Sequence, residues 1–154
     1  MNIIQMKARD VEMFFEELVR LKYRSMEYSF PKGTRGLERI CRQKILEIPD
    51  YITKGKAVVI GTVDEDGILV GFLWAYPREF LDEKRLFING IAVSEQYEGT
   101  GIAKKMLSYL KNIGKATGYS AIDLMVAPFN HHAVDFYRAA GFEDERIQMV
   151  LKIE

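Results

Sequence analysis

Two glycines one residue apart, Gly99 and Gly101, stand between an apolar run and an amphipathic stretch. Glycine adopts positive φ readily and lets a ligand approach the main chain closely. With a strand before this turn and a helix after it, the N–H groups of residues 99–103 point outward along the positive end of the helix dipole. Such an N-terminus binds anions, and a diphosphate suits its geometry. Lys104 and Lys105 could add charge there or could be ordinary solvated lysines.

Other phosphate-binding motifs fit this turn poorly. A Walker A loop requires Gly-Lys-Ser/Thr, which the chain lacks. A dinucleotide-binding turn requires a third small residue where Lys104 stands, and it normally follows the first strand of a domain. No metal site is predicted either, because the only two histidines, His131 and His132, would point about 100° apart on a helix.

A second group of residues follows the next predicted strand. Asn130 suits a helix N-cap, and Gly141 suits the turn that ends the helix. Between them, an apolar stripe includes a tyrosine that could belong to the core or could act on a ligand; the stripe is Ala133, Phe136, Tyr137 and Ala140.

Composition indicates one ordinary globular domain over residues 1–154, 48% hydrophobic and 29% charged. Lys plus Arg equals Asp plus Glu at 22 each, so no overall field attracts nucleic acid or an anionic membrane. The single cysteine, Cys41, cannot form an internal disulfide, which fits a reducing compartment. The N-terminus does not resemble a signal peptide, and the longest apolar stretch, Ile68–Tyr76, is too short to span a bilayer. We therefore expect a cytoplasmic protein.

Periodicity and end signals predict a mixed α/β sheet with the order β-α-α-β-β-β-α-β-α-β. Asp10 is expected to cap the first helix, and Pro49 to end the second. The predicted strands are 3–7, 57–63, 68–76, 86–93, 121–127 and 146–153, and the predicted helices are 11–24, 37–47, 99–117 and 131–140. Residues 77–84 are expected to form a polar loop. The strands at 86–93 and 121–127 should be parallel, because the helix between them makes a right-handed crossover.

The two blocks together resemble the GNAT superfamily of acetyl-CoA-dependent N-acetyltransferases. Gln96-x-x-Gly99-x-Gly101 matches the family's diphosphate loop, and residues 130–142 match its second segment. The order of elements matches over essentially the whole chain. The resemblance implies a GNAT-like fold in which the strands at 86–93 and 121–127 splay apart and the cofactor enters the gap.

The resemblance also implies which residues contact the cofactor. The backbone of Ile91, Ala92 and Val93 would pair with the pantetheine arm like an added strand. Asn130 would reach the pantetheine, and Tyr137 would protonate the departing CoA thiolate. The diphosphate would lie on Gln96, Glu98, Gly99, Thr100, Gly101, Ile102, Ala103 and Lys104.

One acid in the loop departs from the family pattern. Relatives often carry a basic residue at the position of Glu98. A carboxylate there suits the N-terminus of a helix in the empty protein but would repel a diphosphate. We therefore expect the side chain of Glu98 to turn outward.

The group that deprotonates the acceptor amine stays open. The strand at 86–93 contains no carboxylate, so Asp123 on the next strand and Glu83 before the central strand are the catalytic candidates beside Tyr137. Each of these acids could equally be a solvated surface residue, and a base could also act through water.

The resemblance places the acceptor near the loop after the first helix and the segment before the central strand. Tyr28, Phe30 and Asn89 are the substrate-binding candidates. The acceptor could be a small amine, an amino sugar, a polyamine or a peptide amine.

The resulting prediction is an acyltransferase that moves the acetyl group of acetyl-CoA to a primary amine by direct attack. The alternative is a non-catalytic acyl-CoA-binding sensor or interaction module. Neither function calls for a metal, a nucleic acid or a membrane, and both are compatible with a homodimer.

Overall fold

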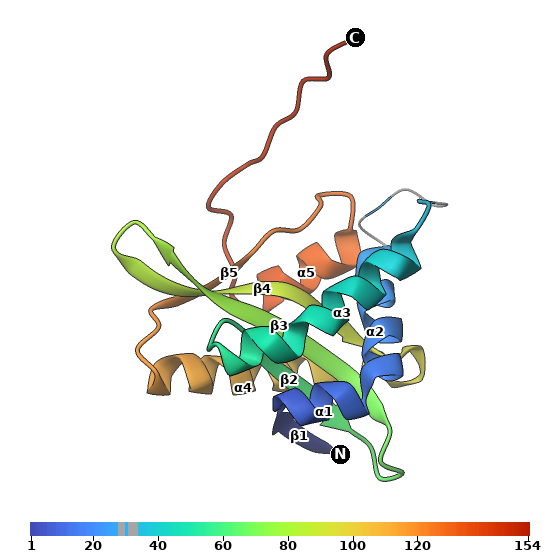
Figure 1. Ribbon diagram of the computed structural model, residues 1–154. Helices are drawn as coiled ribbons and strands as arrows, with labels where there is room; N and C mark the ends of the chain where they lie inside the picture. The colour runs from blue at the N-terminus through green and yellow to red at the C-terminus, as the bar shows by residue number, and fades with distance from the viewer. Residues whose placement is uncertain (28–29, 31–33) are drawn as a thin grey trace.

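The computed structural model describes residues 1–27, 30 and 34–154. Its centre is a five-stranded sheet in the order β1-β2-β3-β4-β5 (Figure 1). β1 to β4 are antiparallel neighbours, and β4 and β5 are parallel, which confirms the predicted mixed α/β sheet. The strands are β1 Asn2–Gln5, β2 Val58–Val63, β3 Leu69–Phe80, β4 Glu83–Val93 and β5 Ala121–Leu124.

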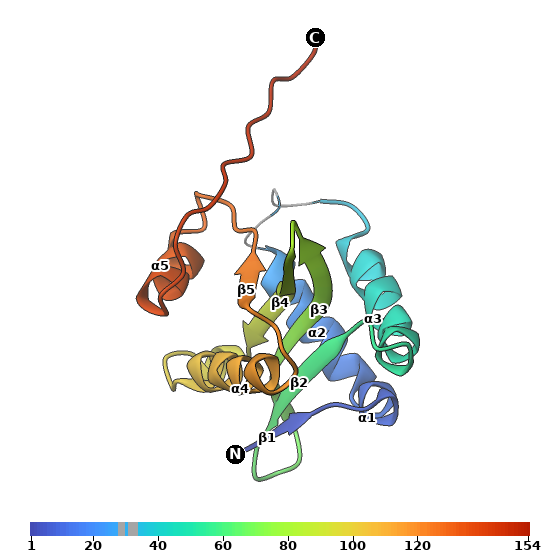
Figure 2. The same ribbon diagram turned by 90° about the vertical axis from the view of Figure 1, so that its left-hand side faces the viewer.

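Helices cover both faces of the sheet. α1, α2 and α3 lie on one side, and α4 and α5 lie on the other (Figure 2). The helices are α1 Ala8–Met13, α2 Phe15–Glu27, α3 Leu37–Thr53, α4 Ile102–Ala116 and α5 His131–Ala139, with the short 3-10 helix η1 Glu95–Tyr97 before α4.

The core has two parts because successive strand residues point to opposite faces. On β3, Phe72 and Trp74 pack with α1–α3, whereas Leu73 and Ala75 pack with α4. α4 contributes Ile102, Met106, Leu107 and Leu110 to the second cluster. This packing fixes where α4 begins, and therefore where the glycine turn lies relative to β4.

The first helical region differs from the prediction. It begins at Ala8 rather than Val11 and breaks at Phe14 into α1 and α2. Asp10 is inside the first turn of α1, where its carboxylate accepts a hydrogen bond from the Lys7 backbone N–H at 2.8 Å. The expectation that Asp10 is the N-cap was wrong, because Lys7 occupies that position. Asp10 still satisfies a free N–H group near the start of the helix.

The expected end of the second helix at residue 47 was also wrong. α3 continues through Pro49 to Thr53. Proline removes one backbone donor, and this normally disfavours a helix interior. Here the added turn keeps Ile48 fully buried and packs Ile52 against the core, and this burial offsets the lost hydrogen bond.

The predicted polar loop at 77–84 is a continuation of the hairpin. β3 and β4 pair as far as Phe80 opposite Glu83, so only Leu81 and Asp82 form the turn. β2 pairing ends opposite Ala75. Pro77 therefore lies in a part of β3 that has a neighbouring strand on one side only. A missing N–H costs little at such an edge position.

A bulge in β4 and the shortness of β5 open one edge of the sheet. Trp74 pairs with Gly90 and Ala75 pairs with Ile88, which leaves Asn89 as an extra residue. β5 pairs with β4 only as far as Ile88, and it ends at Leu124 rather than at the predicted residue 127. β4 from Asn89 to Val93 therefore has no neighbour on the β5 side among the described strands.

The predicted strand at 146–153 is absent. The chain after α5 is extended and exposed, and both views show it running away from the sheet (Figures 1 and 2). Its alternating apolar pattern is typical of a strand, but none of the strands in the described part of the chain lies beside it.

Candidate active site

The glycine turn has the geometry that the sequence predicts. Gly99 and Gly101 both have positive φ, 74° and 86°, and α4 begins directly afterwards at Ile102. Within the described part of the chain, no group accepts a hydrogen bond from the backbone N–H groups of residues 101–104, whereas Lys105 donates to the Gly101 carbonyl at 3.0 Å. The free N–H groups and the helix dipole together form a site for an anion.

A groove of about 550 Å³ runs beside this turn. Both lysines whose role the sequence left open, Lys104 and Lys105, line it. The lining residues are Ile3, Gly101, Lys104, Lys105, Ser108, Tyr109 and Asn112. The groove thus extends the anion site along the first three turns of α4 and supplies two positive charges.

The loop before α4 is held in place by its own hydrogen bonds. The Thr100 hydroxyl donates to the Tyr97 carbonyl at 2.5 Å. The Tyr97 hydroxyl donates to Asp64, in the β2–β3 turn, at 3.3 Å. Burial, followed by the charge of Asp64, raises the pKa of Tyr97, so this donor stays protonated. Gln96 lies in the same 3-10 turn and is exposed.

Glu98 is paired with a cation. Its carboxylate accepts a hydrogen bond from Arg24, on α2. The Nε of the same guanidinium donates to the Val93 carbonyl at 2.8 Å. Arg24 thus links α2, the end of β4 and the glycine loop, and its charge opposes the repulsion that Glu98 would exert on an anion.

The open edge of β4 can accept an extended ligand. In an antiparallel strand, the N–H and C=O of one residue point to the same edge, and the edge alternates along the chain. Ser94 donates to Val70 on β3 at 2.8 Å, so Val93 and Ile91 point to the opposite, open edge. Because Arg24 already occupies the Val93 carbonyl, the N–H of Val93 is the group left for a ligand.

The second block lies on α5 as predicted. The Asn130 side chain caps the helix, because its Oδ1 accepts a hydrogen bond from the Ala133 N–H at 3.4 Å. The side-chain NH2 group of Asn130 is left for other partners. Tyr137 is half-buried, and its ring packs edge-on against Phe136 and Phe142 at 5.4 Å. Burial raises the pKa of Tyr137 to about 12, so the phenol is protonated at neutral pH and carries a proton that it can donate.

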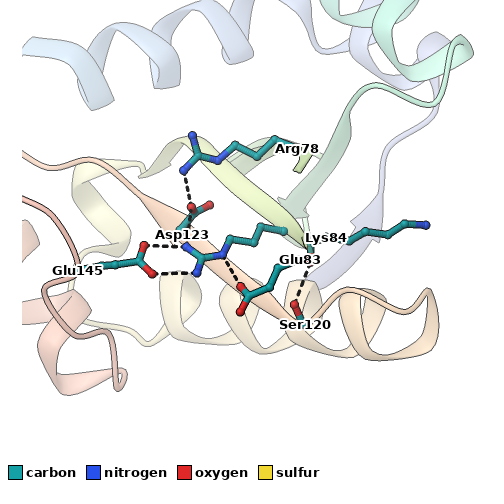
Figure 3. A network of polar contacts seen from close by, with 7 residues as sticks. Arg78, Glu83, Lys84, Ser120, Asp123 and Glu145 are labelled. Atoms are coloured by element: carbon teal, nitrogen blue, oxygen red, sulfur yellow. Dashed lines mark hydrogen bonds and ion pairs between the residues drawn. The ribbon is translucent and has the colours of Figure 1, made fainter. Parts of the chain in front are cut away.

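The two acids predicted as catalytic candidates belong to an arginine cluster on β3, β4 and β5 (Figure 3). Asp123 Oδ2 accepts from Arg78 at 2.5 Å and from Arg85 at 3.3 Å. Glu83 accepts from Arg85 at 2.8 Å, and Glu145 accepts from both terminal nitrogens of the same guanidinium. Asp123 Oδ1 is buried and has no hydrogen-bond partner in the described part of the structure.

A separate cleft of about 300 Å³ opens between α3 and the sheet, and most of its residues escaped the sequence prediction. It is lined by Lys44, Glu47, Tyr51, Lys56, Trp74, Tyr76 and Asn89. The spacing of Lys44, Glu47 and Tyr51 places them on one face of a helix, and this was the available signal. Asn89, a predicted substrate residue, lines this cleft and is also the first residue of the open β4 edge.

The cleft has a buried lysine behind it. Lys22, on α2, is 2% exposed, and its Nζ donates to the Asn89 carbonyl at 3.2 Å and lies 5.3 Å from the centre of the Trp74 ring. Burial and then the charge of Lys44 lower the pKa of Lys22 to about 8. Of the other predicted substrate residues, Phe30 is exposed, and Tyr28 lies outside the described residues.

A profile of the Acetyltransferase (GNAT) family matches residues 15–142. The chain belongs to this family. Known GNAT relatives are distant: "Probable N-acetyltransferase camello" of Xenopus tropicalis is 23% identical over 73% of this chain and 51% of its own length. "N-alpha-acetyltransferase 50" of Danio rerio is 38% identical over 49% of this chain and 46% of its own length. The chain thus spans about half the length of the curated relatives that it matches.

Solved structures share the GNAT fold over the whole chain. A mutant BH1408 protein from Bacillus halodurans has a TM-score of 0.77 and 22% identity, with 100% of both chains covered. An aminoglycoside acetyltransferase from an uncultured soil metagenomic sample has a TM-score of 0.73 and 18% identity, with 99% and 96% covered. The predicted GNAT fold is therefore confirmed, and GNAT enzymes take their acetyl group from acetyl-CoA.

The described residues contain no group of three or more His, Cys, Asp or Glu side chains arranged to hold a metal ion. None of their helices is both long and apolar enough to cross a bilayer.

Proposed function

We propose that this GNAT chain transfers the acetyl group of acetyl-CoA to the primary amine of a small molecule. One observation carries the proposal: the free N–H groups of residues 101–104 lie at the end of a β4 edge that no described strand occupies. Coenzyme A requires both features: the N–H groups can bind its diphosphate, and the β4 edge can pair with its extended pantetheine arm.

The residues divide the binding of coenzyme A between them. The N–H groups at the α4 N-terminus, with Lys104, hold the diphosphate. Ile91 and Val93 receive the pantetheine as an added strand, and the free amide of Asn130 contacts it from α5. In this arrangement the thioester lies near the β4 bulge, where Asn89 joins the cofactor edge to the cleft under α3.

The reaction is then direct attack. The neutral amine adds to the thioester carbonyl, forming a C–N bond, and a free backbone N–H of the open β4 edge stabilises the oxyanion. The C–S bond breaks, and Tyr137 gives its proton to the thiolate, which leaves as the CoA thiol. The attacking nitrogen loses its extra proton as the neutral amide forms, and Tyr137 regains a proton through solvent.

The acceptor must lose a proton before it attacks. Asp123 and Glu83 stay candidates for this role, but their arginine partners weigh against them. Glu47 is the carboxylate that lines the cleft itself, and it accepts from Tyr51 at 3.3 Å. The nearby positive charges of Lys22 and Lys44 also favour the neutral form of an amine bound there.

The charges in the cleft favour one class of acceptor. Lys44 and Lys56 have no ion-pair partner among the described residues, and they oppose a polycation such as a polyamine or an aminoglycoside. An acceptor with one amine and one carboxylate or phosphate would pair with both signs of charge, because Glu47 lines the same cleft.

The test combines binding and turnover. Acetyl-CoA should raise the unfolding temperature, and thiol release should appear with amino acids more than with their uncharged methyl esters or amides. Polyamines and aminoglycosides should react least. Stabilisation by acetyl-CoA without thiol release from any amine would instead support the non-catalytic acyl-CoA-binding module, and absence of stabilisation would overturn both.

A further inference from the structure

A buried cation of α2 lies against the bulge of β4. Lys22 is 2% exposed, and its Nζ donates to the Asn89 carbonyl at 3.2 Å. No carboxylate of the described residues pairs with it, so the Asn89 carbonyl and the nearby Trp74 ring are the groups that stabilise its charge. A buried charge without a counter-ion costs stability, and such groups concentrate at functional sites.

The main chain next to the bulge leaves room for this ammonium group. A Cβ added to Gly90 would lie 3.0 Å from the Nζ of Lys22, which is closer than an ordinary contact. The glycine therefore lets the ammonium approach the peptide between Asn89 and Gly90. The charge of Lys22 thus lies directly against the first residues of the open β4 edge.

The open segment of β4 has few free carbonyl groups. Lys22 occupies the carbonyl of Asn89. Arg24, on the same helix, occupies the carbonyl of Val93. The N–H groups of Ile91 and Val93 point to the open edge and stay available to a ligand. A segment with covered carbonyls and free N–H groups is electropositive, which suits a place where negative charge develops on an oxygen.

We propose that Lys22 is a positioning residue for acetyl transfer: it holds the Asn89 carbonyl away from the thioester oxygen and brings positive charge to that end of β4. This rests on the proposed function, because it takes the thioester to lie near the bulge. Lys22 acts through the Asn89–Gly90 peptide and need not touch a reactant. Negative charge grows on the thioester oxygen as the amine adds, so a nearby cation stabilises the transition state more than the bound substrate.

The surroundings of Lys22 make its charge sensitive to pH. Burial, followed by the charge of Lys44, lowers its pKa to about 8. The titratable groups that face it are Lys44 and Cys41, both on α3, whereas β3 presents the Trp74 ring and β4 the Asn89 carbonyl. Burial raises the pKa of Cys41, so its thiol titrates above the range in which Lys22 loses its charge.

The first experiment observes the thioester without an acceptor, so any effect of Lys22 on the amine is absent. The ¹³C resonance of acetyl-CoA labelled at its carbonyl should move downfield on binding at pH 6.5, because a nearby cation draws electron density from the C=O bond. The change should shrink as the pH rises to 9, with a midpoint near 8. Tyr137, with a pKa of about 12, does not titrate in this range.

Lys22→Met should give a smaller downfield change without that midpoint. Arg20→Met, which removes an exposed cation of the same helix, is the matched control and should follow the original chain. If Lys22→Met fails to fold, the pH series of the original chain decides by itself. A carbonyl resonance that does not change between pH 6.5 and 9 in the original chain overturns the proposal.

Turnover gives a second measure. Lys22→Met should lower kcat at pH 7 by about tenfold, less than the loss of a direct oxyanion donor. The dissociation constant for CoA should stay within about twofold, because the contacts to the diphosphate and the pantetheine are unchanged. An unchanged kcat in Lys22→Met overturns the role of Lys22 and leaves acetyl transfer intact. Absence of CoA binding to the original chain overturns the proposed function, and the role of Lys22 with it.

Discussion

At the residue scale, the acid beside the anion site is neutralised by a neighbour distant in sequence. Glu98 alone would weaken the binding of a diphosphate, but Arg24 pairs with it from α2 and also binds the Val93 carbonyl. The pairing accounts for an acid at a position where a cation would be expected. It also makes the contribution of Arg24 measurable by a double-mutant cycle.

Arg24→Met should weaken the binding of CoA by between about two- and tenfold, because it leaves the Glu98 carboxylate unopposed near the diphosphate. Arg24→Met combined with Glu98→Gln should recover most of the affinity. Titration calorimetry with CoA measures both. A pantetheine thioester without the diphosphate is the control, and an equal loss with this ligand would show that Arg24 acts on the β4 edge instead.

Tyr137 is the second residue whose chemistry depends on its surroundings. Burial raises its pKa to about 12, so it keeps its proton until it can pass it to the leaving thiolate. Tyr137→Phe should lower kcat by about 10²-fold, at the low end for general acids, because a thiolate is already a moderate leaving group. The dissociation constant for CoA should stay within about twofold. An unchanged kcat would remove Tyr137 from the mechanism.

At the element scale, the start of α4 depends on a backbone conformation that only glycine adopts easily. Gly101 has φ of 86°, and an added Cβ would meet no atom within 4 Å, so strain and not crowding decides the effect of a substitution. Gly101→Ala should lower the free energy of unfolding by about 1–2 kcal/mol. It should also weaken CoA binding, because the N–H groups of residues 101–104 would shift.

Urea denaturation measures the stability change, and calorimetry measures the binding. Lys111→Ala, at an exposed position of the same helix, serves as the control and should change neither quantity appreciably. Equal stability of Gly101→Ala and the original chain would contradict the argument from backbone strain.

Local signals were enough to predict the elements of the proposed cofactor site. The glycines before α4, the Asn130 cap of α5 and the parallel β4–β5 pair all follow from patterns a few residues long. The errors arise where distant contacts override local preference. Burial of Ile48 carries α3 through Pro49, and the end of β2 lets β3 continue through Pro77.

The cleft under α3 escaped prediction for the same reason. Glu47, Trp74 and Asn89 come from three elements and meet only in the folded molecule. Residues 146–153 are a different case, because their pattern is typical of a strand but no strand in the described part of the structure pairs with them.

At the scale of the whole molecule, the three-helix layer is joined to the sheet through a buried charge. Lys22 reaches from α2 to the Asn89 carbonyl and the Trp74 ring, with Lys44 and Cys41 as its other close titratable neighbours. Burial, and then the charge of Lys44, lower its pKa from 10.5 to about 8. Between these two values the unfolded chain binds more protons than the folded one, so stability increases with pH across that window. Below about pH 8 both states are protonated, and this contribution becomes constant.

Lys22→Met keeps the length of the side chain and removes the titration. The difference in the free energy of unfolding, original chain minus variant, should therefore rise between about pH 8 and 10.5 and be flat below pH 7. Urea denaturation at one-unit pH intervals measures it, and the exposed Lys111→Met serves as the control. Parallel curves for the original chain and Lys22→Met would mean that Lys22 titrates alike in both states. Lys22 would then behave as a solvated ammonium group between the helices and the sheet.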